Sequence, residues 1–233
     1  GVLNTDNMSL AGESFDYGPF AFLDRWDPSF TAAYFDQTGL YSYGRQPAIC
    51  RKNLQLLQNA LAMLLPRPPM EQSLERYAST YQNHYRFCLL RRLGLTPNPD
   101  LDSDERLVSA TLELIASWPV GYGDFFAGLA SVVQSAGLPQ EPEGLPVVLP
   151  DCSAPARELW QNWRDAWWWQ TQARAVPGSE PVASVSERLM RWNLSQTPTR
   201  PLIESLWEPI DQDDDWRPLK GWLISAGAPD DEG

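Results

Sequence analysis

Two acidic residues and an amide stand close together near the start of the chain. Asp6 and Asn7 belong to the run Asn4-Thr5-Asp6-Asn7-Met8-Ser9, and Asp16 follows in Phe15-Asp16-Tyr17-Gly18-Pro19-Phe20. Carboxylate and amide oxygens are the ligands that a hard cation such as Mg²⁺ prefers, with water and substrate phosphates completing its shell. The set predicts a metal and catalytic site, and turn chemistry, which short-range Asp and Asn residues often serve, is the alternative.

The same runs resemble the central signature of the selenoprotein O family, also called SelO or YdiU. The resemblance continues in fixed order through four motifs: Asp27-Pro28, Tyr41-Ser42-Tyr43-Gly44, Gln46-Pro47-Ala48-Ile49 and Asn53-Leu54. Short motifs in constant order over about fifty positions are a specific signal. After Leu145 only fragments are similar, including parts of the stretch from Arg200 to Trp216.

The resemblance implies a fold and an activity. The fold is mainly α, the C-lobe of a protein-kinase-like fold with a helical C-terminal extension and with the N-lobe absent. The activity is that of a protein adenylyltransferase, which transfers AMP from ATP to Ser, Thr or Tyr hydroxyls of a protein substrate. Such reactions depend mostly on positioning and on neutralisation of charge.

The resemblance also assigns roles to the first cluster. Asp6 resembles the catalytic-loop aspartate that accepts the hydroxyl proton. Asn7 and Asp16 resemble the two metal ligands, and Asp16 thereby also contacts the ATP phosphates. Mg²⁺ is the implied ion, and Mn²⁺ is the alternative.

The sequence departs from the family pattern upstream and in its cysteines. The family's nucleotide-binding lobe, with its Gly-rich region and phosphate-binding Lys and Arg residues, lies upstream of the signature, and this chain begins with Gly1 inside it. We therefore expect a fragment of a longer protein, a pseudokinase-like lobe that binds ATP poorly and is inactive without the N-lobe. Ala32 stands where many members carry a cysteine, which puts the redox control proposed for the family in doubt.

Composition narrows the class of partner. The 233 residues include 18 basic and 30 acidic ones, for a net charge of −12, which argues against a nucleic-acid surface and against an anionic membrane. No apolar run approaches membrane-spanning length. Cys50, Cys88 and Cys152 share no metal-like spacing, so we expect unpaired thiols in a reducing compartment and a cytoplasmic location. The oligomeric state stays open.

Periodicity separates a loop-rich start from a helical remainder. Residues 1–48 alternate glycine, proline and aromatic residues, which predicts loops and short strands. Helices are predicted from Asn53 to the prolines at 66–69, from Met70 to Leu93, from Ser103 to Ser117 and from Tyr122 to Ala136, with Gly94 and Gly137 ending the second and fourth. The predicted domains are a kinase-like C-lobe at 1–138 with the catalytic and metal-binding loop, a Pro-rich linker at 139–155, and a helical C-terminal extension and tail at 156–233.

A tryptophan-rich helix is predicted from Ala156 to Arg174. Trp160, Trp163 and Trp167 recur at the spacing of a helix core stripe. If Trp168 and Trp169 point outward, they form an interaction patch. This leaves a rival function, a non-catalytic protein-binding module that uses the Trp-rich helix. An incomplete gene product without function is a third alternative.

Other polar groups are predicted to serve structure. Capping and turn roles are expected for Asp24, Asp27 and Asp36, and a helix-surface or packed position for His84. The acidic run from Asp211 to Asp215 lacks the glycine and glutamate of a calcium loop, so a solvated loop is expected. A further helix is predicted from Ser184 to Trp192, followed from Leu194 by a segment of proline, acid and tryptophan that frays into a polar tail.

Overall fold

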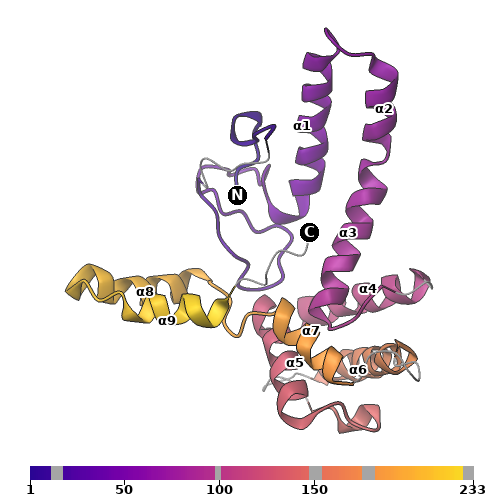
Figure 1. Ribbon diagram of the computed structural model, residues 1–233, viewed down its shortest axis with the longest axis vertical. Helices are drawn as coiled ribbons and strands as arrows, with labels where there is room; N and C mark the ends of the chain where they lie inside the picture. The colour runs from indigo at the N-terminus through magenta and orange to yellow at the C-terminus, as the bar shows by residue number, and fades with distance from the viewer. Residues whose placement is uncertain (12–17, 98–100, 147–153, 175–181, 228–233) are drawn as a thin grey trace. The chain divides into compact units, whose positions relative to one another are not determined.

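The computed structural model describes residues 1–11, 18–97, 101–146, 154–174 and 182–227 (Figure 1). Across these ranges all regular structure is helical, which confirms the mainly α prediction. The short strands predicted within residues 1–48 are wrong for the described part of that segment. Its backbone groups bond within tight turns instead: the Asp36 N–H donates to Ala33 O at 3.0 Å and the Gly39 N–H to Asp36 O at 3.2 Å.

The chain divides into two compact units. The first contains Gly1–Ala21 and Asp27–Tyr85, and the second contains Phe22–Trp26 and Arg86–Gly233. Both predicted domain boundaries, near residues 138 and 155, fall inside the second unit. The predicted three-part division stays a prediction.

In its described residues the first unit has two 3₁₀ turns, the helices α1 and α2, and the first part of α3. The turns are η1 (Thr5–Asn7) and η2 (Tyr43–Arg45), and the helices are α1 (Gln46–Leu61), α2 (Arg67–Glu75) and the first part of α3 (Tyr77–Arg92). Pro47 lies in the first turn of α1, where its missing N–H is tolerated because N–H groups there have no partner within the helix. Helix α1 therefore begins at Gln46, earlier than the predicted start at Asn53. Pro68 likewise opens α2 instead of only ending the preceding helix. The single helix predicted from Met70 is interrupted at Arg76.

The second unit holds the hydrophobic core. It contains α4 (Leu101–Ser117), α5 (Tyr122–Ala136), η3 (Pro142–Gly144), α6 (Ala154–Arg174) and α7 (Val182–Trp192). Helix α4 packs against α6, and α5 packs against α7. The helix predicted from Tyr122 to Ala136 has the bounds of α5, and Leu107, Leu114 and Ile115 of α4 are buried.

Helix α3 ends at Arg92, and Gly94 terminates it, as predicted. Gly94 has a left-handed backbone with φ of 72°, a conformation that glycine adopts without a Cβ clash. The Leu95 N–H donates to Leu90 O at 2.8 Å and the Gly94 N–H donates to Arg91 O at 2.9 Å. These two bonds satisfy the last carbonyls of the helix and turn the chain back toward the core.

Two more helices lie where periodicity predicted only a fraying segment. They are α8 (Arg200–Asp213) and α9 (Arg217–Ala226), and each carries a proline in its first turn. Asp214, with a left-handed φ of 52°, ends α8. Asp215 then accepts the Arg217 N–H at 3.0 Å, which satisfies the backbone donor of the first residue of α9. The prolines and acids that suggested an irregular tail therefore start and stop helices.

Candidate functional site

Asp6 and Asn7 lie in the short turn η1. The Asn4 side chain caps this turn, because its Oδ1 accepts the Asn7 N–H at 3.1 Å. Asp6 is exposed, so its carboxylate is accessible from solvent. Asn7 is half-buried and its Nδ2 donates to Val2 O at 3.5 Å, which makes Oδ1 the amide atom available to a cation.

Helix α1 anchors this loop through Asn53. The Asn53 Nδ2 lies 2.6 Å from Leu3 O and 3.0 Å from the Met8 sulfur, so one amide contacts the chain on both sides of η1. Asn53 was predicted only as part of a motif and as the start of a helix. Its positioning role could not be found by periodicity, because fifty positions separate it from Leu3; the motif match was the only signal.

The third predicted residue of the set, Asp16, lies outside the described residues. The structure therefore brings Asp6 and Asn7 together in one turn, and the predicted ligation by Asn7 and Asp16 stays a prediction. Within the described ranges no group of three His, Cys, Asp or Glu side chains could hold a metal. The chemistry of the donor set still fits a hard divalent cation, since it combines carboxylate and amide oxygens.

The other acidic residues of this region include two that hold turns, as predicted. The Asp27 Oδ1 accepts the hydroxyl of Ser29 at 2.6 Å and its N–H at 2.8 Å, and these bonds lower the pKa of Asp27. Asp36 accepts the N–H groups of Tyr41 at 2.7 Å and Leu40 at 2.9 Å, the Tyr41 bond being the main reason for its lowered pKa. These carboxylates are engaged in loop structure.

Comparison with known proteins decides the family. A family model described as protein adenylyltransferase SelO matches residues 1–226. The chain belongs to the SelO family. The match extends through α8 and α9, well beyond the fragments that are recognisable by eye after Leu145.

Relatives with the same family names match most of the chain. It is 40% identical over 219 residues to the protein nucleotidyltransferase YdiU of Trichodesmium erythraeum, covering 94% of this chain and 44% of that protein. It is 42% identical over 229 residues to that of a Synechococcus strain, covering 95% and 45%. The mitochondrial protein adenylyltransferase SelO-1 of Danio rerio is 40% identical over 132 residues, covering 57% and 19%. The chain thus spans less than half the length of these relatives.

The Trp-rich helix of this SelO-family chain is a core element. Trp160, Trp163 and Trp167 are fully buried, which confirms the predicted stripe. The indole of Trp163 donates to Thr111 Oγ1 at 2.8 Å. Trp168 is only 9% exposed and donates to Pro139 O at 3.0 Å, whereas Trp169 is 63% exposed. An interaction patch on this face would rest on Trp169 alone among the five.

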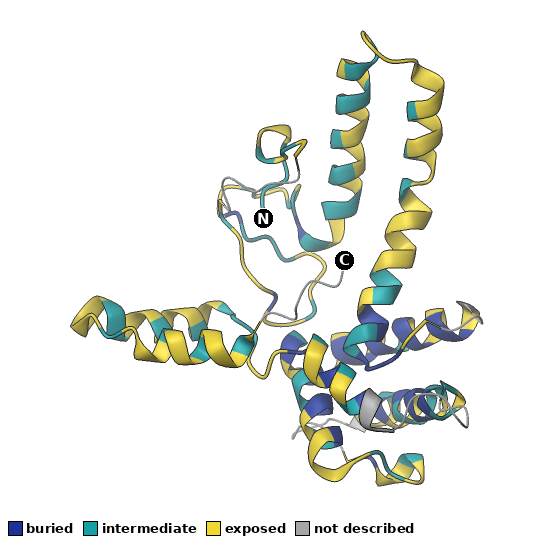
Figure 2. Cartoon of the chain, viewed as in Figure 1, coloured by how far each residue is buried: buried dark blue, intermediate teal, exposed yellow. Residues whose placement is uncertain are grey.

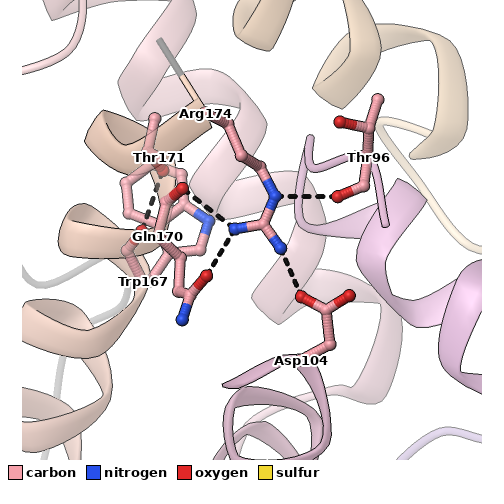
Figure 3. A network of polar contacts seen from close by, with 6 residues as sticks. All are labelled: Thr96, Asp104, Trp167, Gln170, Thr171 and Arg174. Carbon is pink, nitrogen blue, oxygen red and sulfur yellow. Dashed lines mark hydrogen bonds and ion pairs between the residues drawn. The ribbon is translucent and has the colours of Figure 1, made fainter. Parts of the chain in front are cut away.

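A buried ion pair fixes the end of the same helix (Figure 3). Arg174 pairs with Asp104, which is fully buried, and its Nε donates to Thr96 O at 2.8 Å. Burial lowers the pKa of the Arg174 guanidinium, and the Asp104 carboxylate acts in the opposite direction. The pair therefore joins α4 to α6 and has a structural role.

In the described parts of the chain, none of the helices combines the length and apolar content needed to cross a membrane.

Proposed function

We propose that this chain supplies the catalytic and metal-binding residues of a protein adenylyltransferase. Membership of the SelO family over residues 1–226 is the observation that carries the proposal. The accessible Asp6 carboxylate and the capped turn that holds Asn7 beside it support the assignment. The kinase-like C-lobe architecture is part of this proposal.

In the proposed reaction the hydroxyl oxygen of a substrate Ser, Thr or Tyr attacks the α-phosphorus of ATP. The new oxygen–phosphorus bond forms, the bond from the α-phosphorus to the bridging oxygen breaks, and pyrophosphate leaves. Asp6 accepts the hydroxyl proton, a step for which a carboxylate must reach the attacking oxygen. The Asn4 cap and the Asn53 anchor fix the loop, so that the carboxylate is held in position.

Asn7 and Asp16 are the residues we assign to the metal. Mg²⁺, or Mn²⁺ as the alternative, would neutralise charge on the phosphates when bound. In the SelO family the Lys and Arg residues that bind the phosphates lie upstream of the signature. We therefore expect the chain by itself to bind ATP weakly and to transfer AMP slowly or not at all.

The test uses two proteins: the chain itself, and a chimera in which it replaces the matching 219-residue region of the Trichodesmium erythraeum relative. Transfer of label from α-³²P-ATP to protein is measured with Mg²⁺ and with Mn²⁺. We expect the chimera to be active and Asp6→Ala to lower its rate by about 100-fold or more. The matched control Asp213→Ala, on the exposed acidic end of α8, should leave the rate unchanged.

Two results would contradict the proposal. A folded chimera without transfer activity would show that this chain cannot supply the catalytic residues. An active Asp6→Ala chimera would remove Asp6 from the reaction. If the chain alone is as active as the chimera and Asp16→Ala abolishes that activity, the expected need for the remaining lobe is wrong.

A further inference from the structure

Helices α1, α2 and the first part of α3 form an apolar groove within the first unit. Its volume is about 790 Å³, and its apolar lining consists of Leu54, Leu57, Leu61, Pro69, Met70, Leu74, Tyr77 and Tyr81. Figure 2 shows α1 and α2 without any buried residue. The groove therefore presents a leucine and tyrosine stripe that the described part of the first unit does not bury.

The walls of the groove are held in place by the fold. Tyr77, Tyr81 and Tyr85 stack along α3 with ring centroids 6.3 and 6.0 Å apart. The Tyr77 hydroxyl donates to Pro47 O at 2.9 Å, which ties α3 to the beginning of α1. Helices α1 and α2 pack against each other. The groove is thus preformed, as binding sites usually are.

The charge around the groove favours an acidic occupant. Among the described residues, its lining contains Arg76 and His84 and no acidic side chain. An adjoining hollow shares Gln58 and Leu74 with it and contains three basic and two acidic side chains: Arg51, Lys52, Arg67, Glu71 and Glu75. Residues 46–85 carry four basic and two acidic residues, or +2, in a chain of net charge −12. A cationic ligand would meet repulsion here, whereas carboxylates would be complementary.

The dimensions of the groove fit a helix. Its lining on α2 and α3 extends from Pro69 to His84, which is about 22 Å at the helical rise of 1.5 Å per residue. A partner helix of about 15 residues has that length. Two helices with an apolar stripe between them accept a third helix whose apolar residues recur at three- and four-residue spacing.

We propose that this groove binds an acidic amphipathic helix of a partner protein. The apolar face of that helix lies on the stripe formed by Leu54, Leu57 and Tyr81, and its carboxylates lie near Arg76 and the basic side chains of the adjoining hollow. This inference goes beyond the proposed transferase function and does not depend on it, because none of the lining residues belongs to the catalytic turn.

The first experiment compares two probes on the purified chain. One is a fluorescein-labelled 15-residue peptide with leucine at helical three- and four-residue spacing and glutamate elsewhere. The other has lysine in place of every glutamate. Fluorescence anisotropy should show the acidic peptide binding at least tenfold more tightly, with an affinity that falls as salt is raised. Equal affinities, or no binding of the acidic peptide, would overturn the proposal.

Matched variants locate the site. Arg76→Glu should weaken binding of the acidic peptide by about fivefold or more. Arg200→Glu, an equal charge change on exposed α8, should have little effect on that affinity. Leu54→Ala should weaken binding, whereas Leu223→Ala, at an exposed leucine of α9, should not. Circular dichroism confirms the fold of each variant. If both variants of either pair lose the same amount of peptide affinity, the attraction is non-specific and the assignment of the site to this groove is wrong.

A second copy of the chain is the rival occupant. Sedimentation of the unlabelled chain across a range of concentrations measures this directly. If the chain dimerises and Leu54→Ala makes it monomeric, the groove is a self-association surface and the partner-protein proposal is wrong. A monomer that binds the acidic peptide supports the proposal.

Discussion

The core of the second unit and the helices α1 and α2 use apolar residues in opposite ways. In α6, Trp160, Trp163 and Trp167 are fully enclosed, whereas α1 and α2 contain no buried residue although a leucine stripe runs along α1. Helical periodicity is present in both cases. Burial differs because α4 and η3 pack on α6 and Phe125 of α5 contacts Trp163, whereas α1 packs on α2 and meets α3 through the Tyr77 hydroxyl. An apolar stripe therefore becomes core only where enough elements cover it.

This difference has a functional side. In the second unit, buried polar groups bond to one another within the core, as in the bond from Trp163 to Thr111. The first unit carries the predicted catalytic turn and the apolar groove on surfaces that solvent reaches. Under the two proposals, the residues that stabilise the fold and those that bind ligands lie in different units, so variants can test them separately.

The largest effect should come from Trp163→Ala in the core. Removing a buried tryptophan leaves a cavity and should lower the free energy of unfolding by about 3–5 kcal/mol. Trp169→Ala on the same helix removes a largely exposed ring and should cost less than about 1 kcal/mol. Urea unfolding followed by circular dichroism measures both. Similar losses would show that the two tryptophans do not differ in packing as described.

Breaking the buried ion pair should have the next largest effect. Arg174→Met removes a cation from the buried Asp104 carboxylate and should destabilise the fold by about 3 kcal/mol. The control Arg200→Met removes an exposed pair with Glu204 at 2.8 Å, and such pairs contribute about 0.3–0.5 kcal/mol. The same unfolding measurement applies. An Arg174→Met variant with an unchanged free energy of unfolding would mean that the pair contributes nothing to joining α4 and α6.

Two glycines with similar positive φ compare backbone strain with packing. Gly94 and Gly137 have φ of 72° and 74°, and Gly137 has ψ of −177°, a region that almost only glycine adopts, so alanine at either position should be strained by about 1–3 kcal/mol. At Gly94 the added Cβ would also lie 2.8 Å from Leu189 Cγ, while nothing lies within 4 Å at Gly137. This contact should add about 1–3 kcal/mol to the cost of Gly94→Ala. Thermal unfolding measures both variants, and a cost below about 1 kcal/mol for Gly94→Ala would rule out the close contact with α7.

The smallest predicted effect is the change in the loop around Leu40 and Tyr41 when the Asp36 carboxylate is protonated. The pKa of Asp36 is lowered in the folded chain, so its bonds stabilise the loop above the unfolded-state pKa of 3.8 and are lost as pH falls through the lower folded value. NMR shifts of the Leu40 and Tyr41 amides should report this transition below pH 3.8. Asp36→Asn should abolish it. A midpoint at or above 3.8 would contradict the lowered pKa.

The motifs around Asp6 and Asn53 identify the family from sequence because short patterns in fixed order carry that information without any structure. Sequence periodicity also predicted the bounds of α5, the stop at Gly94 and the Trp160–Trp167 stripe, since each depends on neighbours within a few residues. Local signals were weaker for α8 and α9, where prolines and acids that suit the first turn of a helix also suit a loop.

The tertiary structure alone decided which polar and aromatic groups are buried. Asp104, predicted at the start of a helix, is enclosed because Arg174 reaches it from α6, seventy positions away. Trp168 is covered and Trp169 exposed because one indole meets Pro139 O. Asn53 anchors the predicted catalytic turn by a bond to Leu3. Each of these outcomes depends on contacts between residues far apart in the sequence, and no periodic pattern within one element encodes such contacts.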